Sequence, residues 1–153
     1  MAADSQLAAP ERAFLAAART AVLATIAPHG GPRLVPICFV VSDIAQGVVV
    51  DSPLDEKPKA VDDVRDLARV RDIMARPRVS LLVDRWSEDW SQLAWLRIEG
   101  SARLVEPSDG GHAGVVTALR VKYPQYASHR LEDRPLIRIS VRSATSWGDL
   151  GSG

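Results

Sequence analysis

Short runs of apolar residues, some alternating with polar ones, predict that most of this chain forms β-strands. The runs are Ala21–Ala27, Leu34–Val41, Val48–Ser52, Val79–Val83, Leu93–Val105 and Leu136–Val141. Turn residues at 28–32 and 43–47 separate the first three runs, so we expect a hairpin that continues into a three-stranded antiparallel meander. Gly100, inside the longest run, predicts a β-bulge or a close approach of another backbone.

Three segments show helical patterns. Pro10–Ala18 has proline in its first turn and good helix formers after it, and Gly114–Lys122 is also predicted to be helical. Between Ala60 and Ala75, apolar residues recur at the spacing of one helix face. The tail 146–153 has few residues that could hold it against the rest of the domain. The pattern predicts a mainly β, α+β fold, an antiparallel barrel with peripheral helices.

Length and charge narrow the class of protein. The 153 residues fit one domain spanning 1–153, and the 46% hydrophobic and 25% charged residues are typical of globular proteins. A net charge of zero argues against a nucleic-acid or membrane-surface binder. The N-terminal residues lack the apolar centre of a signal peptide, and no apolar run is long enough to span a bilayer, so a cytoplasmic location is expected.

Motifs of several enzyme classes are absent. The sequence has no G-x-G-x-x-G, Walker loop, H-E-x-x-H or G-x-S-x-G motif. His29, His112 and His129 share no metal-ligand spacing and are expected at the surface, so no metal site is predicted. Cys38 lies among apolar residues and is expected to be a buried structural thiol. Any chemistry would therefore come from a bound organic cofactor.

A cationic loop is one candidate for holding such a cofactor. Lys57-Pro58-Lys59 lies between a predicted strand and a predicted helix, where two lysines can hold a phosphate or carboxylate tail as point charges. Basic residues continue along the helix and just beyond it, at Arg65, Arg69, Arg71, Arg76 and Arg78. From spacing alone, the ordinary interpretation is that the lysines are solvated and that the arginines pair with nearby aspartates on a solvated helix face.

Tryptophans are a second candidate feature. Trp90 and Trp95 lie just before and at the start of the long strand, and Trp147 lies in the tail. Such rings can cover a flat cofactor, pack across a dimer interface or anchor a loop in the core. A tryptophan in a terminal tail indicates that the tail docks on something.

The ordered set of segments resembles a known family. Its pieces are Ala21–Thr25, Gly31–Phe39, Lys57–Lys59, Arg69–Ile73, Pro77–Asp84, Glu88–Ser91, Trp95–Arg97, Lys122–Tyr126 and Ser146–Gly148. Together they resemble the pyridoxamine-phosphate-oxidase-like superfamily, and more narrowly its branch that uses the deazaflavin coenzyme F420. The resemblance extends from about Pro10 to about Gly148, nearly the whole chain.

The resemblance implies a homodimer of split β-barrels with two cofactors in grooves at the interface. It places Val35, Pro36, Ile37, Cys38, Asp51 and Ser52 along the tricyclic ring and its linker. It places the Lys57-Pro58-Lys59 loop and Arg69 at the phosphate and the lactyl-oligoglutamate tail. Trp90, Trp95 and Trp147 become candidate walls of the substrate pocket, one of them possible from the partner chain.

The implied chemistry is hydride transfer between the deazaflavin and a small conjugated organic substrate, with no nucleic-acid or membrane partner. No side chain stands out as a general acid, so no catalytic residue is named. Two alternatives stay open at this point. One is an FMN-dependent oxidase or reductase on the same fold, and the other is a non-catalytic carrier of F420 or flavin.

Overall fold

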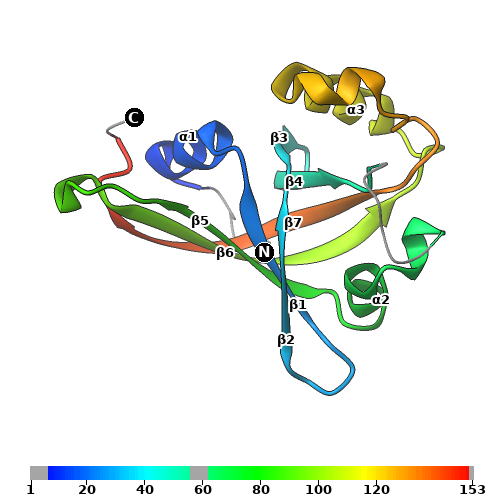
Figure 1. Cartoon of the computed structure of the whole chain (residues 1–153), viewed down its shortest axis with the longest axis horizontal. Helices are drawn as coiled ribbons and strands as arrows, with labels where there is room; N and C mark the ends of the chain where they lie inside the picture. The colour runs from blue at the N-terminus through cyan, green and yellow to red at the C-terminus, as the bar shows by residue number, and fades with distance from the viewer. Residues whose placement is uncertain (1–6, 56–61, 152–153) are drawn as a thin grey trace.

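The computed structural model describes residues 7–55 and 62–151. Within them, seven strands form one antiparallel sheet in the order β2-β1-β5-β6-β7-β4-β3 (Figure 1). The strands are β1 Ala21–Ile26, β2 Pro32–Ile37, β3 Val40–Ile44, β4 Gly47–Pro53, β5 Arg78–Arg85, β6 Ala94–Val105 and β7 Leu136–Gly148. The α-helices are α1 Ala9–Ala17, α2 Ala68–Ala75 and α3 His112–Lys122, and short 3-10 turns are η1 Val64–Asp66, η2 Trp90–Gln92 and η3 Pro124–Ser128.

The sheet curls into a split barrel because its two edges are consecutive in the chain. β2 ends at Ile37 and β3 begins at Val40, yet the two strands lie at opposite edges of the sheet. Only two residues connect them, so the edges must meet at this corner. The β1–β2 hairpin extends away from the rest of the sheet (Figure 1). The predicted antiparallel α+β barrel is confirmed.

A tyrosine fixes the corner where the edges meet. The Tyr123 hydroxyl accepts a hydrogen bond from the Phe39 backbone N–H at 3.0 Å. Its own proton lies within reach of the Arg19 carbonyl oxygen, at 2.9 Å, and the Phe39 carbonyl oxygen, at 3.0 Å. The backbone groups that the strand-to-strand kink removes from the ladder are therefore satisfied by one buried side chain.

Two apolar clusters hold the sheet. The larger one fills the barrel interior and includes Leu23, Leu81, Leu96 and Ile139, with Phe14 of α1 and Ile73 of α2 packed against the strands. The second lies between the α3–η3 segment, with Leu119 and Tyr126, and the strand residues Val40 of β3, Val105 of β6 and Leu136 of β7. The outer face of β1, β5 and β6 has no such helical cover among the described residues.

The expected three-stranded meander is wrong. The run 34–41 is divided at Cys38 and Phe39, so its first half pairs with β1 and its second half with β4. Periodicity cannot reveal this kink, because both halves are apolar and the turn-forming residues that usually mark a strand end are absent. The kink decides that the sheet closes instead of continuing as an open meander.

The single helix expected at 60–75 is also wrong within its described part. η1 and α2 are separated by Leu67, whose φ of −57° and ψ of 137° are extended. In an unbroken helix Val64 and Val70, six residues apart, would point about 120° from each other. The break allows both side chains to enter the same core cluster, together with Leu67.

Three smaller expectations also change. β7 continues to Gly148, which pairs with Ala94, so the first three residues of the tail 146–153 belong to the sheet. His112 is 2% exposed, not at the surface, and its Nε2 lies 2.7 Å from the Arg134 carbonyl oxygen, to which a ring N–H can donate. Cys38 is half-buried and unpaired with another cysteine. The bulge expected at Gly100 is confirmed by a register shift between Glu99 and Gly100.

Candidate functional site

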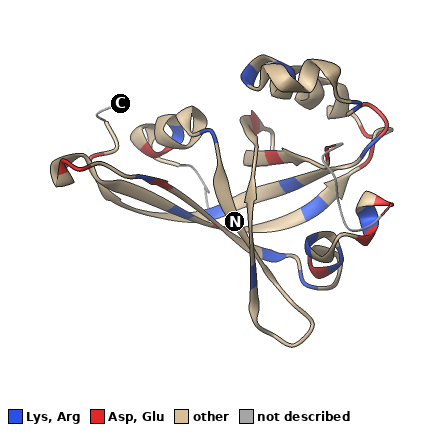
Figure 2. Cartoon of the chain, in the orientation of Figure 1, with Lys and Arg blue, Asp and Glu red and all other residues tan. Residues whose placement is uncertain are grey.

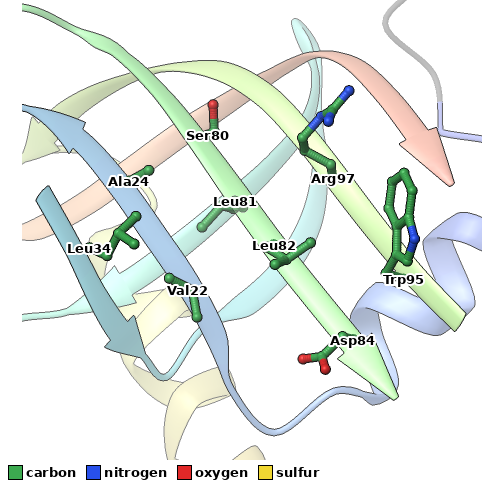
Figure 3. Close-up of a pocket in the computed structure, with 9 residues that line it drawn as sticks. All are labelled: Val22, Ala24, Leu34, Ser80, Leu81, Leu82, Asp84, Trp95 and Arg97. Atoms are coloured by element: carbon green, nitrogen blue, oxygen red, sulfur yellow. The ribbon is translucent and has the colours of Figure 1, made fainter. Parts of the chain in front are cut away.

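An apolar hollow lies on the uncovered outer face of the sheet. Its volume is about 590 Å³, and it spans β2, β1, β5 and β6 (Figure 3). Outward positions on an antiparallel sheet line one face because side chains alternate. The floor is made of small residues, Val22, Ala24 and Ser80, while Leu34 and Leu82 stand beside it with exposed fractions of 65% and 42%. A monomer that leaves large aliphatic side chains around a hollow presents a surface suited to a ligand or a second protein chain.

Polar groups enter the hollow from β5 and β6. Ser80 Oγ donates to Glu99 Oε2 at 2.5 Å, and Arg97 Nε lies 3.5 Å from Glu99 Oε1. The Arg97 guanidinium lies 5.9 Å from the centre of the Trp95 ring. These contacts hold Arg97 and Trp95 along one edge of the hollow (Figure 3).

The structure brings together two of the three predicted tryptophans. Trp95 and Trp147 are directly opposite each other on β6 and β7, and Trp147 is 53% exposed. Trp90 lies on η2, before β6, and is 73% exposed. Only Trp95 lines the hollow. The η2 turn and the end of β7 lie at the other end of the molecule from α2 (Figure 1).

A second pocket, of about 230 Å³, is basic and lies beside α2 and the β1–β2 hairpin. Arg33 of β2 enters it together with Arg71 and Arg76. Arg33 Nε donates to Asp72 Oδ2 at 2.7 Å, and Thr25 Oγ1 donates to the same oxygen at 2.8 Å. We call this the arginine pocket. Its remaining lining is small or rigid, namely Pro28, Ala68 and Ala75.

Asp72 is the buried anchor of the arginine pocket. Its side chain is 2% exposed, and burial by itself would raise its pKa. Hydrogen bonds from Arg33 and Thr25 and the charges of Arg33 and Arg76 outweigh burial, so the pKa of Asp72 lies below its usual value. The carboxylate therefore stays ionised at neutral pH and holds Arg33 in place.

A third group of polar residues surrounds Tyr126 of η3. The Tyr126 hydroxyl donates to Asp55 Oδ2 at 2.8 Å. Burial raises the pKa of Tyr126, and its neighbours Asp55 and Cys38 raise it further, so the hydroxyl is protonated. Arg69 lies near Asp55, whose charge opposes the lowering of the Arg69 pKa by burial. Cys38 thus lies near Tyr126, and Arg69 lies near Asp55, although the four residues are distant in sequence.

Arg69 carries a buried polar atom without a partner. Its Nε is buried and makes no hydrogen bond within the described part of the chain. An unmatched buried donor costs free energy of about 1–3 kcal/mol, so a half-buried guanidinium in this state is suited to an added oxyanion. A phosphate or carboxylate group therefore fits beside Arg69.

The other predicted cofactor residues lie in different environments. Val35 packs against the barrel core and Ile37 is 6% exposed inside it, whereas Pro36 is exposed. Asp51 is fully buried, and its two oxygens accept from Arg138 Nε at 2.8 Å and Nη2 at 3.0 Å. Ser52 is 2% exposed. Among these, Pro36 is the side chain most open to a ligand in a single chain.

Lys57, Pro58 and Lys59 lie outside the described residues. Within residues 7–55 and 62–151, no group of three or more His, Cys, Asp or Glu side chains is arranged to hold a metal ion. No helix in residues 7–55 and 62–151 is long and apolar enough to cross a membrane.

Sequence reasoning missed several residues of these pockets. Thr25, Arg33 and Asp72 come from three different elements. Ser80 and Arg97 can be recognised as neighbours only when the pairing of β5 with β6 is known. One signal was available in the sequence. Asp72 falls on the same helix face as Ala68 and Ala75, where an aspartate between small residues points to a buried partner.

Comparison with known proteins places the chain in a family. The family model described as pyridoxamine 5'-phosphate oxidase matches residues 8–148. No curated protein matches the chain at a significant level.

Solved structures share the fold at low identity. A conserved hypothetical protein from Mycobacterium tuberculosis is 24% identical, with a TM-score of 0.68 over 95% of this chain and 88% of that protein. The heme storage protein HutZ from Vibrio cholerae is 17% identical, with a TM-score of 0.63 and 94% of each chain covered. A protein named F420 reductase is 18% identical, with a TM-score of 0.61 over 88% of this chain and 94% of that protein. At these identities the likeness concerns the fold alone.

Proposed function

Because the chain belongs to the pyridoxamine 5'-phosphate oxidase family, we propose that it is an oxidoreductase that uses coenzyme F420. It transfers a hydride from the reduced deazaflavin to a small conjugated organic acceptor. The observation that carries this proposal is the buried, unpartnered Nε of Arg69, beside which an anionic cofactor group fits. A fold relative named F420 reductase is consistent with the proposal.

Arg69 and the Lys57-Pro58-Lys59 loop bind the anionic end of the cofactor in this proposal. Arg69 donates from a partly desolvated guanidinium, while the two lysines act as point charges. Asp55 lies near Arg69, and its carboxylate also accepts from Tyr126. The hydrogen bond from Tyr126 occupies one oxygen of this carboxylate.

The protein's part in the reaction is binding, orientation and exclusion of water. The cofactor, when bound, supplies the hydride. The apolar residues Val22, Leu34 and Leu82 provide a dry surface on which a flat ring system can rest. Trp95 and Arg97 border that surface and orient a polar group of the acceptor. No described side chain is assigned as a proton donor.

The proposed active form is a homodimer that pairs the uncovered sheet faces. Trp147 and the η2 turn lie at the opposite end of the molecule from α2, so one chain does not bring the tryptophans to Arg69 (Figure 1). A second copy docked on the hollow supplies its own tryptophans to a cofactor held near Arg69. The exposed Leu34, Leu82 and Trp147 give such an interface its apolar area.

A fluorescence titration of the purified protein with F420, and separately with FMN, tests the proposal. We expect F420 to bind more tightly than FMN. In Arg69→Met, F420 should bind about ten- to a hundredfold more weakly, because a charge-assisted hydrogen bond contributes about 1.5–3 kcal/mol. The matched control is Arg130→Met, which removes an equal charge from an exposed ion pair with Asp133 and should leave the affinity unchanged.

Other outcomes assign a different role. Tighter binding of FMN would move the protein to flavin chemistry on the same fold. Tight F420 binding without turnover of any acceptor by the reduced cofactor would make it a carrier. Equal affinity of wild type and Arg69→Met for F420 would remove Arg69 from the site.

A further inference from the structure

A pocket between β3 and the start of α3 takes no part in the proposed function. Its volume is about 430 Å³, and we call it the α3 pocket. α3 packs beside β3 (Figure 1). Apolar side chains line much of the pocket, among them Val40 and Ile44 of β3 and Val115 of α3. The α3 pocket shares no lining residue with the hollow or the arginine pocket. An apolar pocket with a few polar groups suits a small organic molecule.

Glycines keep the α3 side of the pocket open. Gly110, Gly111 and Gly114 line it, and a Cβ added at any of these positions would meet no atom within 4 Å. At these three positions no side chain separates the backbone from a ligand. A molecule in the pocket can therefore approach the first turn of α3 closely.

The first turn of α3 has backbone N–H groups without partners. The helix begins at His112, and its N-cap, Gly111, has no side chain that could accept a hydrogen bond. The N–H of His112 donates to the Asp109 carbonyl oxygen, whereas those of Ala113 and Gly114 donate to no described residue. The first turn also contains no acidic side chain. The positive charge at this helix end, equivalent to about +0.5, is therefore not offset by the helix itself.

A buried cation lines the same pocket. The Arg138 side chain is 9% exposed, and its Nε and Nη2 donate to the two oxygens of Asp51 at 2.8 Å and 3.0 Å. The Arg138 Nη1 donates to no residue within 7–55 and 62–151. The ion pair fixes the plane of the guanidinium, and Nη1 remains as a donor for a ligand.

A second arginine lies beside Arg138 in the sheet. Arg103 of β6 is directly opposite Arg138 of β7, and Asp51 of β4 is opposite Arg138 on its other side. Residues directly opposite each other project from the same face, so this row carries two positive charges and one negative charge, a net charge of +1. Figure 2 shows basic positions on neighbouring parts of β6 and β7, below α3 in this view. Like charges directly opposite each other destabilise a sheet, and a bound anion offsets that repulsion.

From this geometry we propose that the α3 pocket binds a small organic carboxylate with an apolar body. The carboxylate accepts hydrogen bonds from the free N–H groups of Ala113 and Gly114, and the Arg138 guanidinium adds positive charge to the same pocket. The apolar body lies against Val40 and Val115. A single negative charge matches the net charge of +1 in the row beneath the pocket. The inference holds whichever cofactor the chain uses, because none of these contacts belongs to the proposed cofactor site.

The test uses 3-phenylpropanoate as the probe, titrated into the full, nitrogen-15-labelled chain without F420 and followed by two-dimensional NMR. We expect the backbone amide signals of Ala113 and Gly114 to shift and to saturate as the probe is added. The neutral analogue 3-phenylpropanamide has the same apolar body and no charge. It should bind about tenfold or more weakly, because hydrogen bonds to a charged acceptor are the stronger ones.

A pair of variants at one position isolates the role of charge. Gly114→Glu places a carboxylate in the first turn of α3, inside the pocket, and should weaken probe binding about tenfold or more relative to Gly114→Gln, which has nearly the same shape. Both variants are expected to fold, because a Cβ at Gly114 meets no atom within 4 Å and both side chains favour a helix over glycine. Val121→Glu adds the same charge to α3 at an exposed position outside the pocket, and it should change the affinity less than about twofold.

Several results would overturn the carboxylate site. One is the absence of saturable shifts at Ala113 and Gly114 in the wild type. Others are equal affinity for the acid and the amide, and equal affinity of the Gly114→Glu and Gly114→Gln variants for the acid. Shifts confined to residues of the hollow, such as Val22 and Leu82, would place the probe in the proposed substrate site instead, and the α3 pocket would not be its binding site.

Discussion

Lys122, the last residue of α3, has an ammonium group without a hydrogen-bond partner in the described residues. Its Nζ lies 4.0 Å from the centre of the Phe39 ring and 5.4 Å from that of Tyr123. Burial lowers the pKa of Lys122 to about 8, the charge of Arg19 adds to the effect, and Cys38 opposes it. The two aromatic rings therefore offset only part of the free-energy cost of burying the Lys122 ammonium at the corner where the barrel edges meet.

The lowered pKa of Lys122 predicts how the stability of the fold depends on pH. The folded-state pKa of about 8 is below the ordinary value of 10.5, so the unfolded chain binds more protons between these limits. The folded state therefore gains stability as pH rises from about 8 to 10.5, and protonation disfavours it below that range. Lys122→Met should be more stable than wild type at neutral pH, by on the order of 1 kcal/mol after allowance for partial exposure.

Urea denaturation of both proteins at a series of pH values on both sides of 8 checks this prediction. The difference in unfolding free energy should shrink as pH rises, because the wild-type amine becomes neutral. Using the difference cancels the contributions of Tyr123 and Tyr126, whose raised pKa values act in both proteins. A difference that stays constant with pH would show that Lys122 does not titrate in this range.

At the scale of elements, the β6–β7 pair is the longest ladder of the sheet, and Gly100 shapes it. The bulge lies between Glu99 and Gly100, and a Cβ at Gly100 would lie 2.6 Å from the Ser140 carbonyl oxygen and 2.8 Å from Ile139 Cγ2. The backbone oxygen cannot move without disturbing β7. Glycine is therefore required here for close packing and not for a positive φ.

We predict that Gly100→Ala lowers the unfolding free energy by about 1–3 kcal/mol, as overpacking of a core does. The matched control is Gly114→Ala in α3, where a new Cβ would meet no atom within 4 Å. That change should raise stability by about 0.5–1 kcal/mol, because alanine favours a helix over glycine. Thermal melts of both variants measure the contrast, and equal effects at the two positions would contradict it.

At the scale of the whole molecule, the exposed apolar residues are unevenly distributed. Leu34, Leu82 and Trp147 are exposed on β2, β5 and the end of β7, whereas α3 and η3 cover the sheet around Val40, Val105 and Leu136. The proposed dimer buries the uncovered face. Val121, on α3, is 80% exposed and belongs to the covered half, which makes it a suitable control position.

Leu82→Glu is predicted to convert the proposed dimer to a monomer, because it places a charge in the middle of an apolar interface. Val121→Glu should leave the assembly intact. Light scattering coupled to size-exclusion chromatography measures the mass, which should be twice the chain mass of 16.6 kDa for wild type and Val121→Glu. A wild-type mass of one chain, or an unchanged mass for Leu82→Glu, would reject this interface.

The candidate site was only partly predictable, and its residues show why. Arg69 was predicted to meet an anion, and the structure shows its Nε buried without a partner; that it binds a cofactor stays a prediction. Arg33 and Asp72 are 39 positions apart and meet only because α2 packs beside β1. No local pattern encodes such a contact, since the two side chains belong to different elements with independent periodicity.

The sequence by itself determined the class of fold, most strand positions and the bulge at Gly100, because alternation, turn residues and a lone glycine in a strand act within a few positions along the chain. Only the tertiary structure decided that 34–41 divides at Cys38 and Phe39, that the helix breaks at Leu67 and that β7 extends to Gly148. These features depend on closure of the barrel. Closure interrupts regular strands and helices, and in return it buries side chains that are distant in sequence. Closure also leaves one sheet face uncovered, and the proposed function depends on that arrangement.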